Sequence, residues 1–164
     1  MYLCLIEVQK LPYKVSHGKA VQVTYSSDEV FSRIKHEGIQ FIDLQFTGLT
    51  GHFHHTTISA DTFTPDQMKD GLPKLDGSSI IGFTSIQDSD LLLKPDPNTF
   101  AIIPWLTENK TARLLCDVHW GGNRGRLESD PRGISQKAEE YIKTQGFDFS
   151  TWGPEVEFFV FDKV

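Results

Sequence analysis

A loop of small polar residues is the part of this sequence best suited to chemistry. It runs Leu75-Asp76-Gly77-Ser78-Ser79-Ile80, and Asp88-Ser89-Asp90 follows it after a short spacer. An Asp-Gly step bends the chain tightly, and serines add hydroxyl groups without bulk, so several hydrogen-bond donors and acceptors can gather around one charged ligand. An ordinary surface turn and a ligand-binding loop centred on Asp76 both fit this local pattern.

Two further carboxylates lie near the end of the chain, in a segment with the composition of a strand. Trp152-Gly153-Pro154 leads into Glu155-Val156-Glu157-Phe158-Phe159-Val160-Phe161. Side chains alternate along a strand, so Glu155 and Glu157 would share one face. Like charges on so apolar a strand resist burial unless a cation compensates them, and hard carboxylate oxygens suit Mg²⁺ or Mn²⁺. A solvated strand edge with two glutamates is the alternative that the local pattern leaves open.

The elements that must position these groups are one helix and a mixed sheet of four or five strands, which is the α+β class. Ser26 or Ser27 can cap a helix over 28–37, and Gly38 can stop it. Alternation of apolar and polar residues, with turn residues between the runs, predicts the strands. The predicted strands are 41–46 and 53–58, which form a hairpin, then 90–94, 100–105 and 112–120.

Three zones divide the chain. Residues 1–25 show no clear periodicity and are expected to be an N-terminal extension of unknown role, and residues 26–122 hold the α+β domain. Glycines at 121, 122 and 125 mark the boundary, and Asp130-Pro131 begins a helix that runs to Gln145 in a second unit over 130–164. Four apolar residues on one face of that helix are expected to be core. They are Ile134, Ala138, Tyr141 and Ile142.

Composition excludes several classes of function. The net charge is -6 and no run of Lys or Arg exceeds a pair, so a nucleic-acid partner is not expected. Cys4 and Cys116 lie too far apart for a zinc motif or a disulfide framework. The apolar start over residues 1–6 has no basic region before it and meets Glu7 at once, so neither a signal peptide nor a membrane span is expected. These features predict a cytoplasmic protein with reduced thiols.

Histidines cluster on the second strand of the hairpin at positions 52, 54 and 55. A metal site is conceivable there, but no carboxylate or cysteine is spaced to complete it, which favours a structural role. Asp117 and His119 share a strand face and are expected to form cross-strand hydrogen bonds.

From about Ser26 onward the sequence resembles glutamine synthetase of the bacterial and archaeal type, type I. The Asp76-Gly77-Ser78-Ser79 loop with Asp88-Ser89-Asp90 resembles one signature of that family, and Gly153-Pro154-Glu155-Val156-Glu157-Phe158-Phe159 resembles its first metal-ligand strand. The hairpin over 41–58 and Asp130-Pro131-Arg132 resemble further parts of the family chain. The resemblance implies a β-grasp domain followed by the first helix and strand of a catalytic domain truncated at Val164.

The resemblance also implies an activity. Glutamine synthetase uses ATP as co-substrate to phosphorylate the side chain of L-glutamate, and ammonia then displaces phosphate from the γ-glutamyl phosphate to give glutamine, ADP and phosphate. Two or more Mg²⁺ or Mn²⁺ ions per active site would be held in part by Glu155, near the ATP phosphates, and Glu157, near the glutamate. Asp76 would attract ammonium and help to remove its proton, with Ser79 nearby. No other cofactor-binding residue is expected within these residues.

The family architecture implies a ring-shaped homo-oligomer, a dodecamer, in which the Asp76 loop meets the catalytic domain of a neighbouring subunit. A chain of 164 residues is expected to be an N-terminal fragment of such an enzyme and to be inactive alone. Two alternatives remain. One is a ligase that joins glutamate to another amine, a polyamine or methylamine, although Asp76 favours ammonia. The other is a non-catalytic β-grasp binding module, which would have little need of Glu155 and Glu157.

Overall fold

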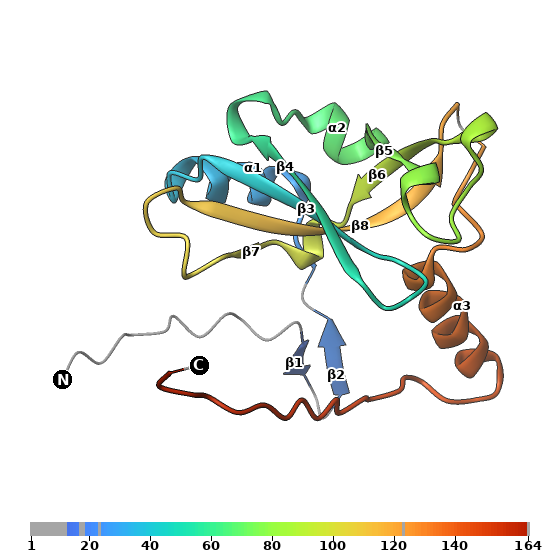
Figure 1. Cartoon of the computed structure of the whole chain (residues 1–164). Helices are drawn as coiled ribbons and strands as arrows, with labels where there is room; N and C mark the ends of the chain where they lie inside the picture. Colours follow the sequence, from blue (N-terminus) through green and yellow to red (C-terminus); the bar gives the residue numbers. More distant parts are fainter. Residues whose placement is uncertain (1–12, 17–18, 23, 123, 164) are drawn as a thin grey trace.

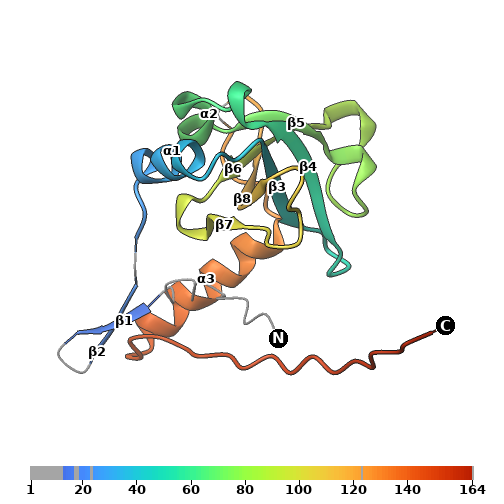
Figure 2. The ribbon, with the colours of Figure 1, turned by 90° about the vertical axis from the view of Figure 1, so that its left-hand side faces the viewer.

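A mixed β-sheet forms the centre of the molecule. The computed structural model describes residues 13–16, 19–22, 24–122 and 124–163. Within these ranges, a six-stranded sheet carries helices α1 (Ser27–His36) and α2 (Pro65–Asp70) on one side, and helix α3 (Pro131–Thr144) lies on the other side (Figure 1; Figure 2). The α+β class and the β-grasp arrangement are therefore confirmed.

The strands follow an order that differs from their order in the sequence. The order across the sheet is β4 (Phe53–Ser59), β3 (Phe41–Thr47), β8 (Thr111–Trp120), β6 (Asp90–Pro95) and β5 (Leu72–Asp76), and β7 (Ala101–Ile102) also pairs with β8. The central strands β3 and β8 are parallel, with Ile42 opposite Ala112, and the other pairs are antiparallel. Parallel neighbours need a long connection, and here it contains β4, α2, β5, β6 and β7.

The core lies between the sheet and helices α1 and α2. Alternate residues of β3 and β8 point into it, because successive strand residues face opposite sides of a sheet. Val30 and Ile34 of α1 and Met68 of α2 pack onto this face. The sheet contributes Ile42, Leu44, Phe46, Leu72, Leu91, Leu93, Ala112, Leu114, Cys116 and Val118.

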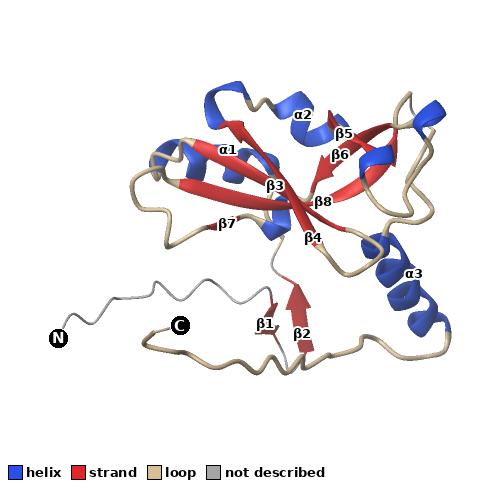
Figure 3. Cartoon of the chain, viewed as in Figure 1, coloured by secondary structure: helices blue, strands red, loops and turns tan. Residues whose placement is uncertain are grey.

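Local sequence signals set where the helices begin. Ser26 caps α1 in a capping box with Glu29, and Thr64 caps α2 in the same way with Gln67. Asp130 caps α3, whose first residue is Pro131. Short 3-10 turns connect the strands (Figure 3). They are η1 (Ala60–Thr62), η2 (Gly77–Ser79), η3 (Ile86–Asp88) and η4 (Pro97–Thr99).

The predicted core face of α3 is wrong for this structure. Ile134 is 51% exposed and Tyr141 is 65% exposed, whereas Gly133 is the buried residue of the helix. Only the start of α3 approaches the sheet, and no other described element covers its apolar side. The amphipathic pattern correctly predicted the helix but not what packs against it.

The strand predicted over Trp152–Phe161 is also not formed. Residues 151–161 have no regular secondary structure and lie exposed, drawn as loop in Figure 3. A strand requires a neighbour for its backbone hydrogen bonds, and no other part of the described chain pairs with this segment. Composition alone predicted a strand here, but the described chain contains no neighbouring strand to pair with it.

Two smaller predictions differ from the structure. The strand expected over 100–105 is limited to β7, because turns follow it directly. Within the zone expected to be an aperiodic extension, β1 (Tyr13–Ser16) and β2 (Lys19–Gln22) form an antiparallel pair. Strands of four residues are too short for their alternation to stand out in a sequence. No helix in the described ranges is long and apolar enough to cross a membrane.

Candidate functional site at the Asp76 loop

Asp76 lies where strand β5 ends and a loop to β6 begins. Asp76 pairs with Asp90 at the start of β6, so the residues between them form a closed loop over paired strand ends. The backbone N–H of Gly77 donates to the carbonyl oxygen of Ser89 at 2.7 Å, which extends this closure by one residue. A Cβ at Gly77 would lie 2.4 Å from Thr84 Oγ1, so the close packing inside the loop favours glycine at this position.

The loop serines hold the Asp76 carboxylate. Oδ1 accepts hydrogen bonds from the backbone N–H of Ser78 at 3.0 Å and from its hydroxyl at 2.7 Å, and Oδ2 accepts one from the Ser79 hydroxyl at 3.2 Å. These bonds stabilise the charged form, so the pKa of Asp76 is lowered, chiefly by Ser78 with smaller effects of Ser89 and Ser79. Asp76 is exposed to solvent. The result is an oriented anion that can bind a cation from solution.

Apolar contacts anchor the far side of the loop. Phe83 is buried, with its ring centroid 6.3 Å from that of Phe46 in the core. Leu49, in the turn between β3 and β4, packs on Gly82, where its Cδ1 lies 2.4 Å from the position a Cβ would take. Phe83 and Leu49 therefore hold the loop against the β3–β4 hairpin.

Arg124 contacts the same loop from the segment that follows β8. Its guanidinium donates to both carboxylate oxygens of Asp88, from Nη1 at 2.6 Å and from Nη2 at 2.8 Å. Hydrogen bonding to Arg124 lowers the pKa of Asp88, and the same bond raises the pKa of Arg124. The sequence pattern included Asp88 but gave no reason to pair it with Arg124. An isolated arginine and an aspartate 36 positions apart carry no signal until the fold brings them together.

A network of ion pairs joins the start of α3 to the second face of the sheet. Asp117 of β8 accepts from Arg126 at 2.7 Å and also from Arg132, which in turn reaches Asp96 at 2.6 Å. Burial opposes the charge of Arg132, but Asp117 and Asp96 raise its pKa. Asp130 accepts from Arg126 as well. The side-chain partners of Asp117 are thus Arg126 and Arg132, which follow β8 in the chain, and not a residue of the neighbouring strand as expected.

Glu155 and Glu157 lie in the exposed C-terminal segment. Both views show this segment at the bottom of the molecule, apart from the loop between β5 and β6, which lies above it at the right (Figure 1; Figure 2). The structure therefore does not bring the two glutamates to Asp76 and Ser79. Among the described residues there is no group of three or more His, Cys, Asp or Glu side chains that could hold a metal ion.

The histidines of strand β4 make structural contacts. The His54 ring stacks on Phe46 at 5.3 Å, and His52 lies 5.2 Å from His54. His55 Nδ1 lies 2.7 Å from Oδ1 of Asp43, a nearly buried carboxylate that also accepts from Thr57 at 2.8 Å. His52 and His54 therefore pack through their rings, and His55 forms a hydrogen bond within the sheet.

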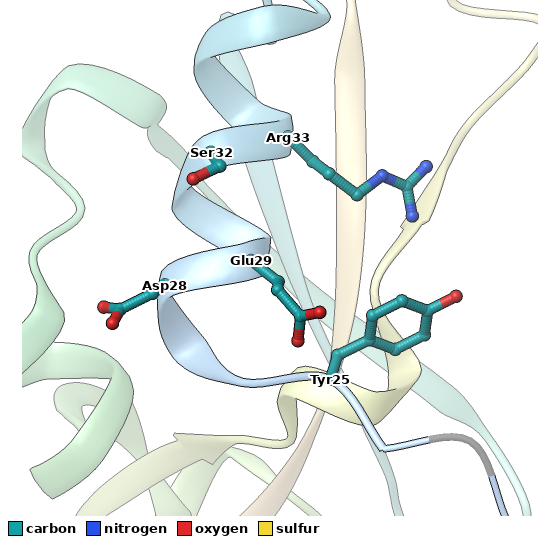
Figure 4. A pocket seen from close by; sticks show the side chains of 5 residues that line it. All are labelled: Tyr25, Asp28, Glu29, Ser32 and Arg33. Atoms are coloured by element: carbon teal, nitrogen blue, oxygen red, sulfur yellow. The ribbon is translucent and has the colours of Figure 1, made fainter.

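Two shallow cavities lie elsewhere. One of about 400 Å³ is lined by Tyr25 and by Asp28, Glu29, Ser32 and Arg33 of α1 (Figure 4). Glu29 is engaged in the capping box of α1, and the Arg33 guanidinium lies 4.9 Å from the centroid of the Phe100 ring. The other cavity, of about 350 Å³, lies beside Asp43 and His55. Neither cavity includes Asp76 or Ser79.

Comparison with known proteins defines the class to which this fold and loop belong. Residues 38–121 match the family model described as glutamine synthetase, beta-Grasp domain. The chain therefore belongs to the glutamine synthetase family and contains its β-grasp domain.

Relatives agree with this family assignment, and a solved structure agrees with the fold. Glutamine synthetase of Sulfolobus acidocaldarius is 51% identical over 136 residues, which cover 83% of this chain and 28% of the relative. The Aquifex aeolicus glutamine synthetase is 43% identical over 85% of this chain and 30% of its own length. A structure of Plasmodium falciparum glutamine synthetase has a TM-score of 0.66 at 23% identity, over 76% of this chain and 24% of that one. The chain thus spans less than a third of the length of these relatives.

Proposed function

We propose that residues 1–164 form the N-terminal part of an ATP-dependent glutamate–ammonia ligase, and that Asp76 draws ammonium to its active site. One observation carries the proposal. In a chain of the glutamine synthetase family, Asp76 is an exposed carboxylate whose orientation is set by hydrogen bonds from Ser78 and Ser79. The relative from Sulfolobus acidocaldarius is named glutamine synthetase, and the Asp76 carboxylate has the negative charge that a cationic substrate requires.

The state of Asp76 supports this role. Because its pKa is lowered, the side chain stays ionised throughout the neutral range, where ammonia is mostly ammonium. Ammonium must lose a proton before its nitrogen can attack the acyl carbon of γ-glutamyl phosphate. A carboxylate at hydrogen-bonding distance is a suitable acceptor for that proton. Oδ2 of Asp76 accepts a 3.2 Å hydrogen bond from the Ser79 hydroxyl, and the side chain is exposed. This oxygen therefore has a lone pair left to accept from a ligand in solution.

We also propose Glu155 and Glu157 as ligands of divalent ions, Mg²⁺ or Mn²⁺. Their carboxylate oxygens fit the ligand preference of these metals, and both side chains are exposed. Two ligands do not complete a site, so the remaining ligands and the ATP pocket would come from residues beyond these 164. When bound, such ions neutralise phosphate charge and act as Lewis acids.

The proposed partners are further copies of the same protein, in a ring whose active sites lie between subunits, with glutamate, ammonium and ATP as substrates. Exposed apolar side chains support a larger assembly, because soluble chains rarely leave so many uncovered. They are Ile81, Ile86, Ile134, Tyr141, Phe158 and Phe159. We propose the cytoplasm as its compartment, since ATP is the co-substrate and the buried Cys116 is a free thiol.

The proposal is tested with the full-length protein. ATP-dependent formation of glutamine is measured against ammonium concentration for the wild type and Asp76→Asn, which keeps the shape of the side chain but removes its charge. We expect an apparent KM for ammonium raised by about tenfold or more, as the loss of an acid–base and charge contribution implies. Asp66→Asn is the matched control, because Asp66 is an exposed acidic residue in the first turn of α2 and should have no effect.

Two results would count against the proposal. Unchanged ammonium dependence in Asp76→Asn would remove Asp76 from the site. Faster product formation with methylamine or a polyamine than with ammonium would favour the alternative function, a ligase that joins glutamate to another amine. The isolated 164-residue chain is expected to form no glutamine, and detectable activity would contradict its proposed status as one part of the enzyme.

A further inference from the structure

We propose that Arg124 is a positioning residue that holds the Asp76 loop through its bidentate contact with Asp88. This inference rests on the proposed function of Asp76. It assigns a role to the segment after β8, which contributes no group to the chemistry itself. Arg124 comes from one end of the sheet and Asp88 from η3, the second turn of the loop, so the contact joins two segments that are distant in sequence.

The contact has the geometry of a strong ion pair. Two parallel hydrogen bonds of 2.6 and 2.8 Å join Nη1 and Nη2 to the two oxygens of Asp88. The side chains are 46% and 52% exposed, so a single such bond would be weak because water screens it. A bidentate fork is the exception among exposed pairs, since it fixes the relative orientation of both groups.

Arg124 is itself held in place by its surroundings. Its guanidinium carbon lies 4.6 Å from the centroid of the Trp120 ring, and its Nε donates to the carbonyl oxygen of Gly121 at 3.1 Å. Trp120 is fixed in turn by a 3.0 Å hydrogen bond from Nε1 to Glu128. The arginine therefore loses little side-chain entropy when it binds Asp88, because stacking has already selected its orientation.

The restraint passes from Asp88 to Asp76 through one residue. Ser89 follows Asp88, and its carbonyl oxygen accepts the 2.7 Å hydrogen bond from Gly77 N–H. The Ser89 side chain also contributes to the lowered pKa of Asp76. Phe83 anchors the middle of the loop in the core, so the Arg124–Asp88 pair supplies a second anchor beside the residues that orient the carboxylate. Without it, the loop would keep the packing of Phe83 and Leu49 but would lose the side-chain anchor at Asp88.

The experiment compares Arg124→Gln, Asp88→Asn and the double variant in the full-length protein. Amide hydrogen exchange of residues 77–79 is measured first, because it needs no substrate. We expect exchange about threefold to fivefold faster in each single variant, the range that an exposed bidentate pair supports. Exchange in the double variant should be no faster than in either single variant, since all three variants lose the same contact. Arg124→Lys should restore only part of the protection, because lysine cannot form the fork.

Kinetics then separate positioning from general stability. The apparent KM for ammonium should rise about threefold to fivefold, with the KM for glutamate and ATP unchanged. Arg33→Gln is the matched control, since Arg33 also stacks on an aromatic ring, Phe100, but lies on α1. It should leave both exchange and ammonium dependence as in the wild type.

The outcomes distinguish this inference from the proposed function. Unchanged exchange at residues 77–79, or additive effects in the double variant, would overturn the restraint. Faster exchange with an unchanged ammonium KM would overturn the positioning role alone. Absence of ligase activity in the wild type would refute the proposed function. It would also refute the positioning role, even if hydrogen exchange confirmed that the Arg124–Asp88 contact restrains the loop.

Discussion

Replacing Asp130 with alanine should detach helix α3 from the sheet. Asp130 is 1% exposed and makes four kinds of contact at once. Its Oδ1 accepts from the backbone N–H of Arg132 at 3.1 Å, which caps the helix. Its Oδ2 accepts from the backbone N–H of Val118 at 3.2 Å and from Arg126 Nε at 2.9 Å, and forms an ion pair with Arg126 Nη2 at 2.7 Å.

The expected cost follows from these contacts. Loss of the helix cap is worth about 1 kcal/mol. The N–H of Val118 would be left buried without a partner, at about 1 to 2 kcal/mol. Arg126 would lose its ion pair with position 130 but would keep the one with Asp117, and its side chain is 24% exposed. The loss of this ion pair therefore costs less than the loss of a fully buried one, about 1 kcal/mol. Together Asp130→Ala should lower the free energy of unfolding by about 3 to 4 kcal/mol, or the Tm by roughly 6 to 16 °C.

Urea unfolding, followed by circular dichroism and tryptophan fluorescence, measures this change. Asp130→Asn keeps the shape and can still accept hydrogen bonds, so it should lose about half as much as the alanine variant. Asp66→Ala, at the exposed first turn of α2, should stay within about 0.5 kcal/mol of the wild type. A loss below about 1 kcal/mol for Asp130→Ala would refute the reasoning, since the contacts would then contribute almost nothing.

Two other predictions concern the Asp76 loop. Gly77→Ala should destabilise the protein by about 1 to 3 kcal/mol, because its Cβ would lie 2.4 Å from Thr84 Oγ1 and 2.6 Å from Leu91 Cδ1. Gly153→Ala, where nothing lies within 4 Å, is its control, and equal thermal unfolding curves for both would contradict the steric argument. The Asp76 carboxyl should titrate below the ordinary pKa of 3.8, and Ser78→Ala should move its midpoint upward, as followed by NMR of the carboxyl carbon. Because the pKa of Asp76 is lowered in the folded protein, its stabilising contribution is complete above pH 3.8 and is lost as the pH falls through the lowered pKa. A titration midpoint at or above 3.8 would contradict the hydrogen bonds from Ser78 and Ser79 to this carboxylate.

Local signals in the sequence predicted the elements around the site well. Ser26 and Asp130 mark the starts of their helices as expected, because a capping side chain acts on the backbone two or three residues away. The hairpin of β3 and β4 and the long strand β8 follow from alternation, which depends only on neighbouring residues. Predictions failed where a partner decides the outcome, as for the apolar face of α3 and the strand over Trp152–Phe161.

The sequence by itself determined the Asp76 loop, its serines and the family to which they belong, since these depend on residue type and short spacing. The roles of Glu155 and Glu157 were inferred from the family resemblance and remain proposals. Only the tertiary structure decided which distant residues support the loop. Arg124 meets Asp88 because the sheet order places β8 beside β6. Asp130 meets Val118 because the chain after β8 folds back, with Arg126 opposite His119 and Leu127 N–H donating to the Val118 carbonyl oxygen. Contacts of this kind depend on how strands are ordered in space, and no local pattern encodes that order.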